Sequence, residues 1–157
     1  MKFVARHDID APLEFVQKVL ADFEGWERAA MRRGAEVSRT DKLRQAGPGM
    51  SWLTRFPYRS KERVINVQLL ALDMAGHMAF IGSSASIEGD VKIDLLEMAA
   101  KRTRLHVGIE VKPRTLGARL FLQSLRLARS RVDKSFDARI AMLAADIETR
   151  YRTMQRV

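Results

Sequence analysis

The last third of the chain carries its longest regular pattern of apolar positions. From residue 115 to 157 the apolar side chains recur every 3.7 residues on average, close to the ~3.6-residue period of an α-helix. The positions are Phe121, Leu125, Ala128, Val132, Phe136, Ile140, Leu143, Ile147, Tyr151 and Met154. A long helix is not stable in water on its own hydrogen bonds, so its apolar face must pack on something. The pattern predicts a long C-terminal helix that lies across the rest of the protein.

Before that helix the pattern changes to a period of two residues, which is typical of β-strands with one buried face. We expect a first strand at residues 3–9 and further strands at residues 36–39, 51–58, 63–72, 78–87, 91–99 and 103–112. Gly76 and Gly89-Asp90 are expected in turns, and residues 41–50 form a loop around Gly47-Pro48-Gly49. Strands that follow one another through short turns pair in an antiparallel sheet.

Two short helices are expected between the first and second strands. The first opens at Asp10-Ala11-Pro12, with Asp10 as its N-cap, and ends near Asp22. The second runs from Glu24 to Met31, and Gly34 stops it. The predicted fold is therefore α+β: a curved antiparallel sheet of about seven strands, two short helices after the first strand, and the long C-terminal helix across the sheet, enclosing a cavity.

The length of the terminal segment adds a detail to this prediction. About 40 helical residues would extend ~60 Å, whereas a domain of this size has a radius of gyration of only ~15 Å. Residues 116–127 are apolar nearly all round, while the later part carries one apolar stripe. We therefore expect a bend, or a short leading helix before the main one.

Composition narrows the class of protein. The 157 residues are enough for one domain with a sizeable core, and we expect a single domain at residues 1–157. Cysteine is absent, which excludes disulfides, thiolate metal sites and cysteine nucleophiles. The N-terminus has no apolar signal core, and the longest apolar stretch, residues 64–72, is interrupted by Asn66 and Gln68. We expect a cytoplasmic protein.

The positive charge is concentrated in the terminal helix. The net charge is +9, and residues 112–157 contribute +7 of it from 11 Lys and Arg against 4 Asp and Glu. The basic positions include Arg119, Arg126, Arg129, Arg131, Lys134 and Arg139. They form either a solvated polar face or a surface for peripheral contact with anionic membrane. Nucleic acid is not expected as a partner, because no aromatic side chains are interleaved with the basic ones and no binding motif is present.

Several local motifs match a known superfamily. They are Ile9-Asp10-Ala11-Pro12 after the first strand, residues 22–27 (DFEGWE) at the helix junction, Pro48-Gly49 followed by Trp52, and the leucine- and arginine-rich terminal helix. With the order of the elements, they resemble the START-like (SRPBCC) superfamily, the helix-grip fold of birch-pollen-allergen-like proteins. Its bacterial members include the polyketide cyclase/dehydratase and lipid-transport group. The resemblance implies a hydrophobic cavity and binding of apolar ligands, with no universal catalytic residue to carry over.

The residues expected to line that cavity are the inward positions of the strands, the large aromatic residues and the start of the terminal helix. They are Trp26, Trp52, Thr54, Phe56, Ile65, Val67, Leu69, Phe80, Ile93, Leu95, Glu97, Leu105, Val107, Ile109, Phe121, Leu125 and Phe136. Aromatic side chains at such positions either fill a core or form the wall of a ligand pocket. We expect the partner to be a hydrophobic small molecule.

Catalytic chemistry has few candidates. His7, His77 and His106 are far apart and lie in no metal-binding motif, and no phosphate loop or nucleophile elbow is present, so we expect no metal and no cofactor. Glu97 shares an apolar strand face with Leu95, and if it is buried there, desolvation would raise its pKa and make it a general acid or base. A twist or bulge at the end of the strand would instead let Glu97 meet solvent or an arginine. Tyr58 could supply a hydroxyl group. If the protein is an enzyme, these two residues are the catalytic candidates.

Three functions remain open from the sequence. The first is binding or transport of a lipid, isoprenoid quinone or polyketide-like compound in the cavity, without catalysis. The second is a cyclase or dehydratase that uses the same cavity. The third is a module that binds a protein or membrane surface through the basic C-terminal helix. An apolar cavity favours the first, a buried carboxylate beside a hydroxyl the second, and a filled interior the third.

Overall fold

The computed structural model describes residues 1–156. Its elements, in chain order, are β1 (Lys2–Ile9), α1 (Leu13–Leu20), α2 (Phe23–Arg32), β2 (Glu36–Arg39), β3 (Ser51–Tyr58), β4 (Lys61–Leu72), β5 (His77–Ser83), β6 (Ile87–Ala99), β7 (Arg102–Pro113), α3 (Leu116–Leu127) and α4 (Arg129–Gln155). The alternation and the helical spacing thus predicted every element, and most boundaries agree to within two residues.

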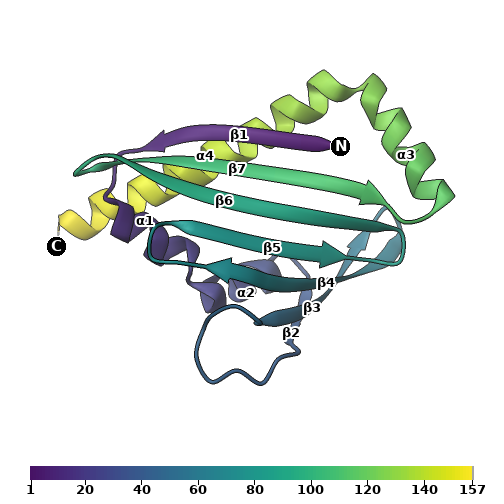
Figure 1. Cartoon of the computed structure of the whole chain (residues 1–157), viewed down its shortest axis with the longest axis horizontal. Helices are drawn as coiled ribbons and strands as arrows, with labels where there is room; N and C mark the ends of the chain where they lie inside the picture. Colours follow the sequence, from purple (N-terminus) through teal and green to yellow (C-terminus); the bar gives the residue numbers. More distant parts are fainter. Residues whose placement is uncertain (157) are drawn as a thin grey trace.

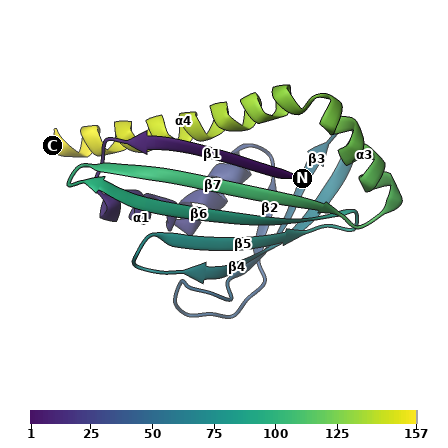
Figure 2. The same ribbon diagram turned by 45° about the horizontal axis from the view of Figure 1, so that its top comes forward.

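The seven strands form one antiparallel sheet in the order β1-β7-β6-β5-β4-β3-β2. Figures 1 and 2 show the sheet curving around the helices, with α4 running along its β1 side and α1 and α2 beneath the central strands. The side chains that face the helices come from alternate positions. On β7 these include Leu105, Val107 and Ile109, which stand opposite Leu95, Ile93 and Val91 of β6. The predicted α+β helix-grip architecture is confirmed.

Two local predictions are wrong. Gly89-Asp90 is not a turn but lies inside β6; the turn is at Ser84–Ser86, where the Ser84 hydroxyl oxygen accepts from the backbone N–H of Ile87 at 3.1 Å. Asp10 does not cap α1, whose N-cap is Pro12 without a side-chain hydrogen bond. The backbone N–H of Asp10 instead donates to Glu148 of α4 at 2.8 Å. The hydrogen-bond acceptor for this backbone N–H therefore comes from a distant helix, and the local sequence could not predict it.

The terminal segment consists of two helices, as its length predicts. The break is at Ala128, whose φ of −107° and ψ of 22° leave the helical region and end α3. Helix α3 then stands at one end of the sheet while α4 crosses it (Figure 2). Val157, the last residue of the predicted helix, lies outside the described residues. Within residues 1–156 no helix is both long and apolar enough to cross a membrane.

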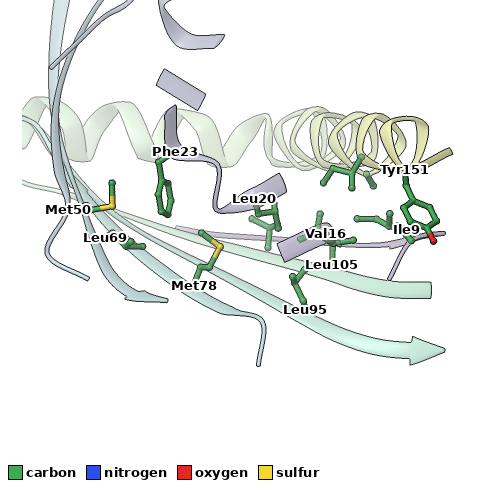
Figure 3. Packing of buried hydrophobic residues seen from close by; sticks show 14 of the residues in the cluster. Ile9, Val16, Leu20, Phe23, Met50, Leu69, Met78, Leu95, Leu105 and Tyr151 are labelled. Atoms are coloured by element: carbon green, nitrogen blue, oxygen red, sulfur yellow. The ribbon is translucent and has the colours of Figure 1, made fainter. Parts of the chain in front are cut away.

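The buried core is one cluster that runs along the concave face from β1 to the central strands, where Leu69 and Met78 are also fully buried. At the β1 end, Ile9, Val16, Leu105 and Ile147 are fully buried between β1, α1, β7 and α4. Figure 3 shows the first three. Thr103 is also buried, and its hydroxyl donates to the carbonyl of Ala11 at 2.8 Å. Toward α2 the core continues through packed aromatic rings: the ring centroids of Phe23 and Trp52 are separated by 5.6 Å, and those of Phe23 and Phe80 by 6.4 Å.

The hairpin between β3 and β4 makes a two-residue turn at Arg59-Ser60. Both residues have positive φ, 51° and 63°, as a type I′ hairpin turn requires. Neither is glycine, asparagine or aspartate, so each bears the cost of a left-handed conformation, about 1–2 kcal/mol. This strained tip projects toward α3 (Figure 2).

Replacing Ser60 by glycine should therefore stabilise the protein. The relief of strain, about 1–2 kcal/mol, exceeds the extra unfolded-state entropy of glycine, about 0.5–1 kcal/mol, so we expect Ser60→Gly to raise the free energy of unfolding by about 0.5–1 kcal/mol. Urea denaturation measures this change. The control is Ser135→Gly on the exposed face of α4, which should lose about 0.5 kcal/mol. A loss of stability in both variants would contradict the prediction.

Candidate ligand-binding cavities

Two cavities lie between the concave face of the sheet and the helices. The inner cavity, about 340 Å³, is lined by α2, the end of α1, Leu143 of α4 and the inward side chains of the central strands. The outer cavity, about 1050 Å³, lies under α3 and is bounded by the β3–β4 hairpin, the β5–β6 turn and the end of β7. Both exist because the helices do not cover the whole concave face.

The inner cavity is almost wholly apolar. Its wall includes Phe23, Trp52, Met78, Phe80 and Ile93, and its polar side chains are Glu27 and Thr54. Glu27 is already engaged, because its carboxylate accepts a hydrogen bond from the indole Nε1 of Trp52 at 2.8 Å. The cavity therefore offers dispersion contacts and a hydroxyl group, and suits an apolar group.

The outer cavity is apolar in its interior and polar at its rim. Phe56, Ile65, Phe121, Leu122 and Leu125 form the apolar wall. The rim carries Tyr58, Arg59, Arg63, Asn66, Arg114 and serines of the β5–β6 turn, with Glu62 as its carboxylate. The guanidinium carbon of Arg59 lies 5.4 Å from the ring centre of Tyr58 and 5.6 Å from that of Phe121. These contacts join the hairpin tip to α3 across the rim.

A pair of glycines lies between the two cavities on the concave face. Gly82 of β5 stands opposite Gly89 of β6, one inward position beyond the pair Phe80 and Val91. A Cβ atom on Gly82 would meet the side chain of Ile65, a wall residue of the outer cavity, at an ordinary 3.7 Å. Neither glycine lines a cavity itself, but a larger side chain at Gly82 would start beside Ile65 on the concave face.

The structure distributes the predicted ligand-binding residues over both cavities and the core. Trp26, Trp52, Thr54, Val67, Phe80 and Ile93 line the inner cavity, and Phe56, Ile65, Phe121 and Leu125 line the outer one. The remaining apolar ones pack in the core and line neither cavity: Leu69, Leu95, Leu105, Val107, Ile109 and Phe136. All of these sit on the helix-facing side of the sheet or on the helices that cover it.

Of the two alternatives for Glu97, the structure shows the exposed one, so the burial on which its role as an acid or base depended is missing. Glu97 is exposed and lines neither cavity. It lies near the end of β6, where a bulge between Glu97 and Ala99 shifts the register with β7, and the inward position opposite it is occupied by the buried Thr103. Tyr58 does line the outer cavity, and its side chain is half-exposed. The structure thus separates the two catalytic candidates.

The three histidines lie away from both cavities. The antiparallel register places Asp94 of β6 opposite His77 of β5 and His106 of β7. His77 hydrogen-bonds Asp94 through Nδ1, and Nδ1 of His106 lies 3.9 Å from the other carboxylate oxygen. His7 instead contacts Asp137 of α4 at 3.0 Å. Because His77 and His106 are far apart in the sequence, their common neighbour Asp94 could not be predicted. Among residues 1–156 no group of three or more metal-ligating side chains is arranged to hold an ion.

Sequence reasoning missed the charged residues of the outer rim. Arg63 precedes Ile65 by two positions and stands opposite Phe56, so the alternation of β4 already places it on the inward face. Arg59 lies in the hairpin turn and Arg114 just after β7, where no periodicity applies. Alternation could therefore have found Arg63, whereas the other two depend on how the sheet curves.

An ion pair between Arg39 and Asp41 adjoins Trp52 in the wall of the inner cavity. The carboxylate of Asp41 accepts hydrogen bonds from the guanidinium of Arg39 at 2.6 and 2.7 Å and from the backbone N–H groups of Leu43 and Ser51 at 3.0 and 2.9 Å. Arg39, followed by the Ser51 N–H, holds the pKa of Asp41 well below its usual range. The same guanidinium lies 5.7 Å from the ring centre of Trp52. Asp41 thus links the 41–50 loop to the cavity wall.

The fold is similar to several solved structures. It superimposes on the Zhui aromatase/cyclase from Streptomyces sp. R1128 with a TM-score of 0.67 and 16% identity, covering 96% of this chain and 94% of that one. Ara h 8.0201 gives a TM-score of 0.58, 13% identity and coverage of 90% and 98%. A START superfamily protein from Mycobacterium smegmatis gives 0.55, 10%, and coverage of 90% and 98%. No family model matches the chain, and no curated protein matches it. These likenesses establish the fold.

Asp41→Asn should make the protein less sensitive to acid. Because the pKa of Asp41 is lowered in the folded state, its carboxylate stabilises the protein above its ordinary pKa, about 3.9, and this contribution is lost as the pH falls below that value. We expect the variant to be less stable than the wild type at pH 7, with the difference shrinking below about pH 4. Chemical denaturation at several pH values measures both curves.

The control for this experiment is Asp133→Asn on α4. Its exposed carboxylate pairs with Arg129 at 3.0 Å, away from the loop. Such exposed pairs contribute little, so the control should follow the wild type. A pH-independent difference between wild type and Asp41→Asn would contradict the assigned role of this carboxylate.

Proposed function

We propose that this chain, which has the START-like (SRPBCC) helix-grip fold, binds or carries a hydrophobic small molecule between its sheet and its C-terminal helices. The observation that carries the proposal is the pair of cavities with apolar walls on the concave face. The ligand classes that suit such walls are a lipid, an isoprenoid quinone or a polyketide-like compound. The family resemblance points the same way.

The size of the cavities supports this proposal over a filled core. Small-molecule sites commonly measure about 300–1,000 Å³, and the two cavities measure about 340 and 1050 Å³. The glycine pair Gly82 and Gly89 puts no side chain on the concave face between the two walls, which costs strand stability because glycine has no side chain to pack and loses more entropy on folding.

A cyclase or dehydratase in the same cavity is the alternative, and the arrangement of the ionisable groups favours it less. Proton transfer needs an acid or base within hydrogen-bond reach of the reacting group. Glu97 is exposed at the end of β6, and Glu27 of the inner cavity is bound by Trp52. Tyr58 is left as a hydroxyl at the outer rim, without a partner carboxylate in a hydrogen bond among residues 1–156. Non-enzymatic binding therefore remains the preferred proposal.

The outer face of α3 suits contact with an anionic membrane, from which an apolar ligand would be collected. Leu116, Leu120 and Leu127 lie within about 40° of one another around the helix, given 100° per residue, and are 71%, 58% and 92% exposed. Arg119 and Arg126 flank this stripe on one side. Exposed leucines beside arginines are typical of helices that lie in a membrane interface, and the opposite face of α3 lines the outer cavity.

Filling the space at Gly82 should block ligand binding. We expect Gly82→Leu to weaken the binding of an apolar fluorescent probe such as Nile red by about tenfold or more, or about 1.4 kcal/mol, while the fold is retained. The control is Gly108→Leu on β7, which points to the opposite face of the sheet, where a Cβ atom meets nothing within 4 Å. Equal binding by the two variants would contradict the proposed site.

Membrane contact should depend on the apolar stripe of α3. In a flotation assay at low salt we expect the protein to bind phosphatidylglycerol vesicles and not phosphatidylcholine vesicles, and Leu127→Ser to reduce binding several-fold. The control is Met74→Ser, because Met74 is as exposed, 91% against 92%, but lies in the turn between β4 and β5 at the other end of the sheet (Figure 1). No binding by the wild type, or equal losses in both variants, would sink this part of the proposal.

A further inference from the structure

Three arginines meet at the rim of the outer cavity from three separate parts of the chain. Arg59 comes from the β3–β4 turn, Arg63 from β4 and Arg114 from the segment between β7 and α3. Glu62 is the carboxylate among the lining residues. Within residues 1–156 none of the three guanidinium groups forms an ion pair. The rim therefore holds three cationic side chains and one carboxylate, and none of the three cations is in an ion pair within the described residues.

Two of these guanidinium groups are held in place without using all their donors. Arg59 lies over the rings of Tyr58 and Phe121, and such stacking occupies the faces of the guanidinium and leaves its N–H edges available. Arg114 donates one Nη1 hydrogen bond to the carbonyl of Ser84 at 3.0 Å, and its backbone N–H donates to Ser86 at 2.7 Å. Both groups are thus positioned before any ligand arrives, which lowers the entropic cost of binding one.

The third arginine, Arg63, is exposed at the rim but lies on the inward face of β4, beside the apolar wall. Arg63 stands opposite Phe56 in the β3–β4 pairing, and both line the outer cavity. No hydrogen bond of the Arg63 side chain is found within residues 1–156. A molecule whose apolar part contacts Phe56, Phe121 and Leu122 would therefore bring its other end within reach of this guanidinium.

Building on the proposed function, we infer that the ligand of the outer cavity is an amphipathic anion. Its apolar body lies inside, and one terminal oxyanion group, a carboxylate or a phosphate, is bound by Arg63 together with Arg59 and Arg114. Guanidinium groups bind carboxylate and phosphate through paired, charge-assisted N–H···O bonds, which are the strongest polar contacts available at a partly dry site. A neutral quinone or hydrocarbon would leave these donors without an acceptor.

The test compares ligands that share a chain and differ in their polar group. Dodecanoic acid, dodecyl phosphate and dodecanol, each below its aggregation concentration, compete with Nile red for the protein. We expect at least one of the two anions to displace Nile red at a concentration about tenfold or more below that of dodecanol. The tighter of the two anions identifies the oxyanion group.

Arg63 is the residue to vary, because its side chain makes no hydrogen bond that the fold would lose. Arg63→Gln should reduce the preference for the anion to about threefold or less and leave dodecanol unchanged, and Arg63→Lys should keep part of the preference. The control, Arg44→Gln in the 41–50 loop, removes an exposed arginine that lines neither cavity and should match the wild type.

The outcomes separate this inference from the proposed function. Equal displacement by dodecanol and by both anions overturns the amphipathic-anion inference and leaves the apolar site intact. An anion preference that survives in Arg63→Gln also overturns it, because the charge would then be bound elsewhere. If neither Nile red nor any of the three compounds binds, the proposed function itself fails.

Discussion

A mismatch in width governs this fold: one helix must cover a sheet that is wider than itself. Seven strands spaced ~4.8 Å apart span about 30 Å across the sheet, whereas a helix with its side chains is only ~10 Å wide. Helix α4 packs on β1 and α1 through Phe136, Ile140, Ile147 and Tyr151, and so covers one side of the concave face. Curvature of the sheet brings the far strands closer to α4, but part of the concave face stays uncovered. The two cavities lie over this uncovered part.

The side chains around this gap are graded along the sheet. At the β1 end, aliphatic residues such as Ile9, Val16 and Leu105 are fully buried and hold α1 and α4 in place. In the middle, Leu69 and Met78 are buried beside aromatic rings, and the pair Gly82 and Gly89 carries no side chains. At the α3 end the wall is apolar and the rim cationic. The fully buried residues thus lie at the β1 end and in the middle, and the outer cavity lies at the α3 end.

Ionisable groups are excluded from the dry part of the concave face. His77, His106 and Asp94 meet on the convex face, and Glu97 is exposed at a bulge. Glu27 reaches the inner cavity but is satisfied by Trp52, and the arginines keep to the outer rim. Such an interior avoids the cost of burying unpaired charge. It is suited to holding an apolar body and leaves few groups that could transfer protons to it.

The sequence by itself determined the elements, because helical and strand periodicity are local properties of the chain. The alternation of β3, β4 and β7, the two short helices and the division of the terminal segment all follow from spacing and length. Tertiary structure alone decided which inward positions are core and which are cavity wall, since Leu69 and Val67 share one face and differ only in what covers them. Tertiary structure also decided that Gly89 lies in β6 and not in the predicted turn, that Glu97 is exposed, and that Arg59, Arg63 and Arg114 line one cavity. These depend on strand register, on the curvature of the sheet and on the reach of α3 and α4, which pairings between distant residues set.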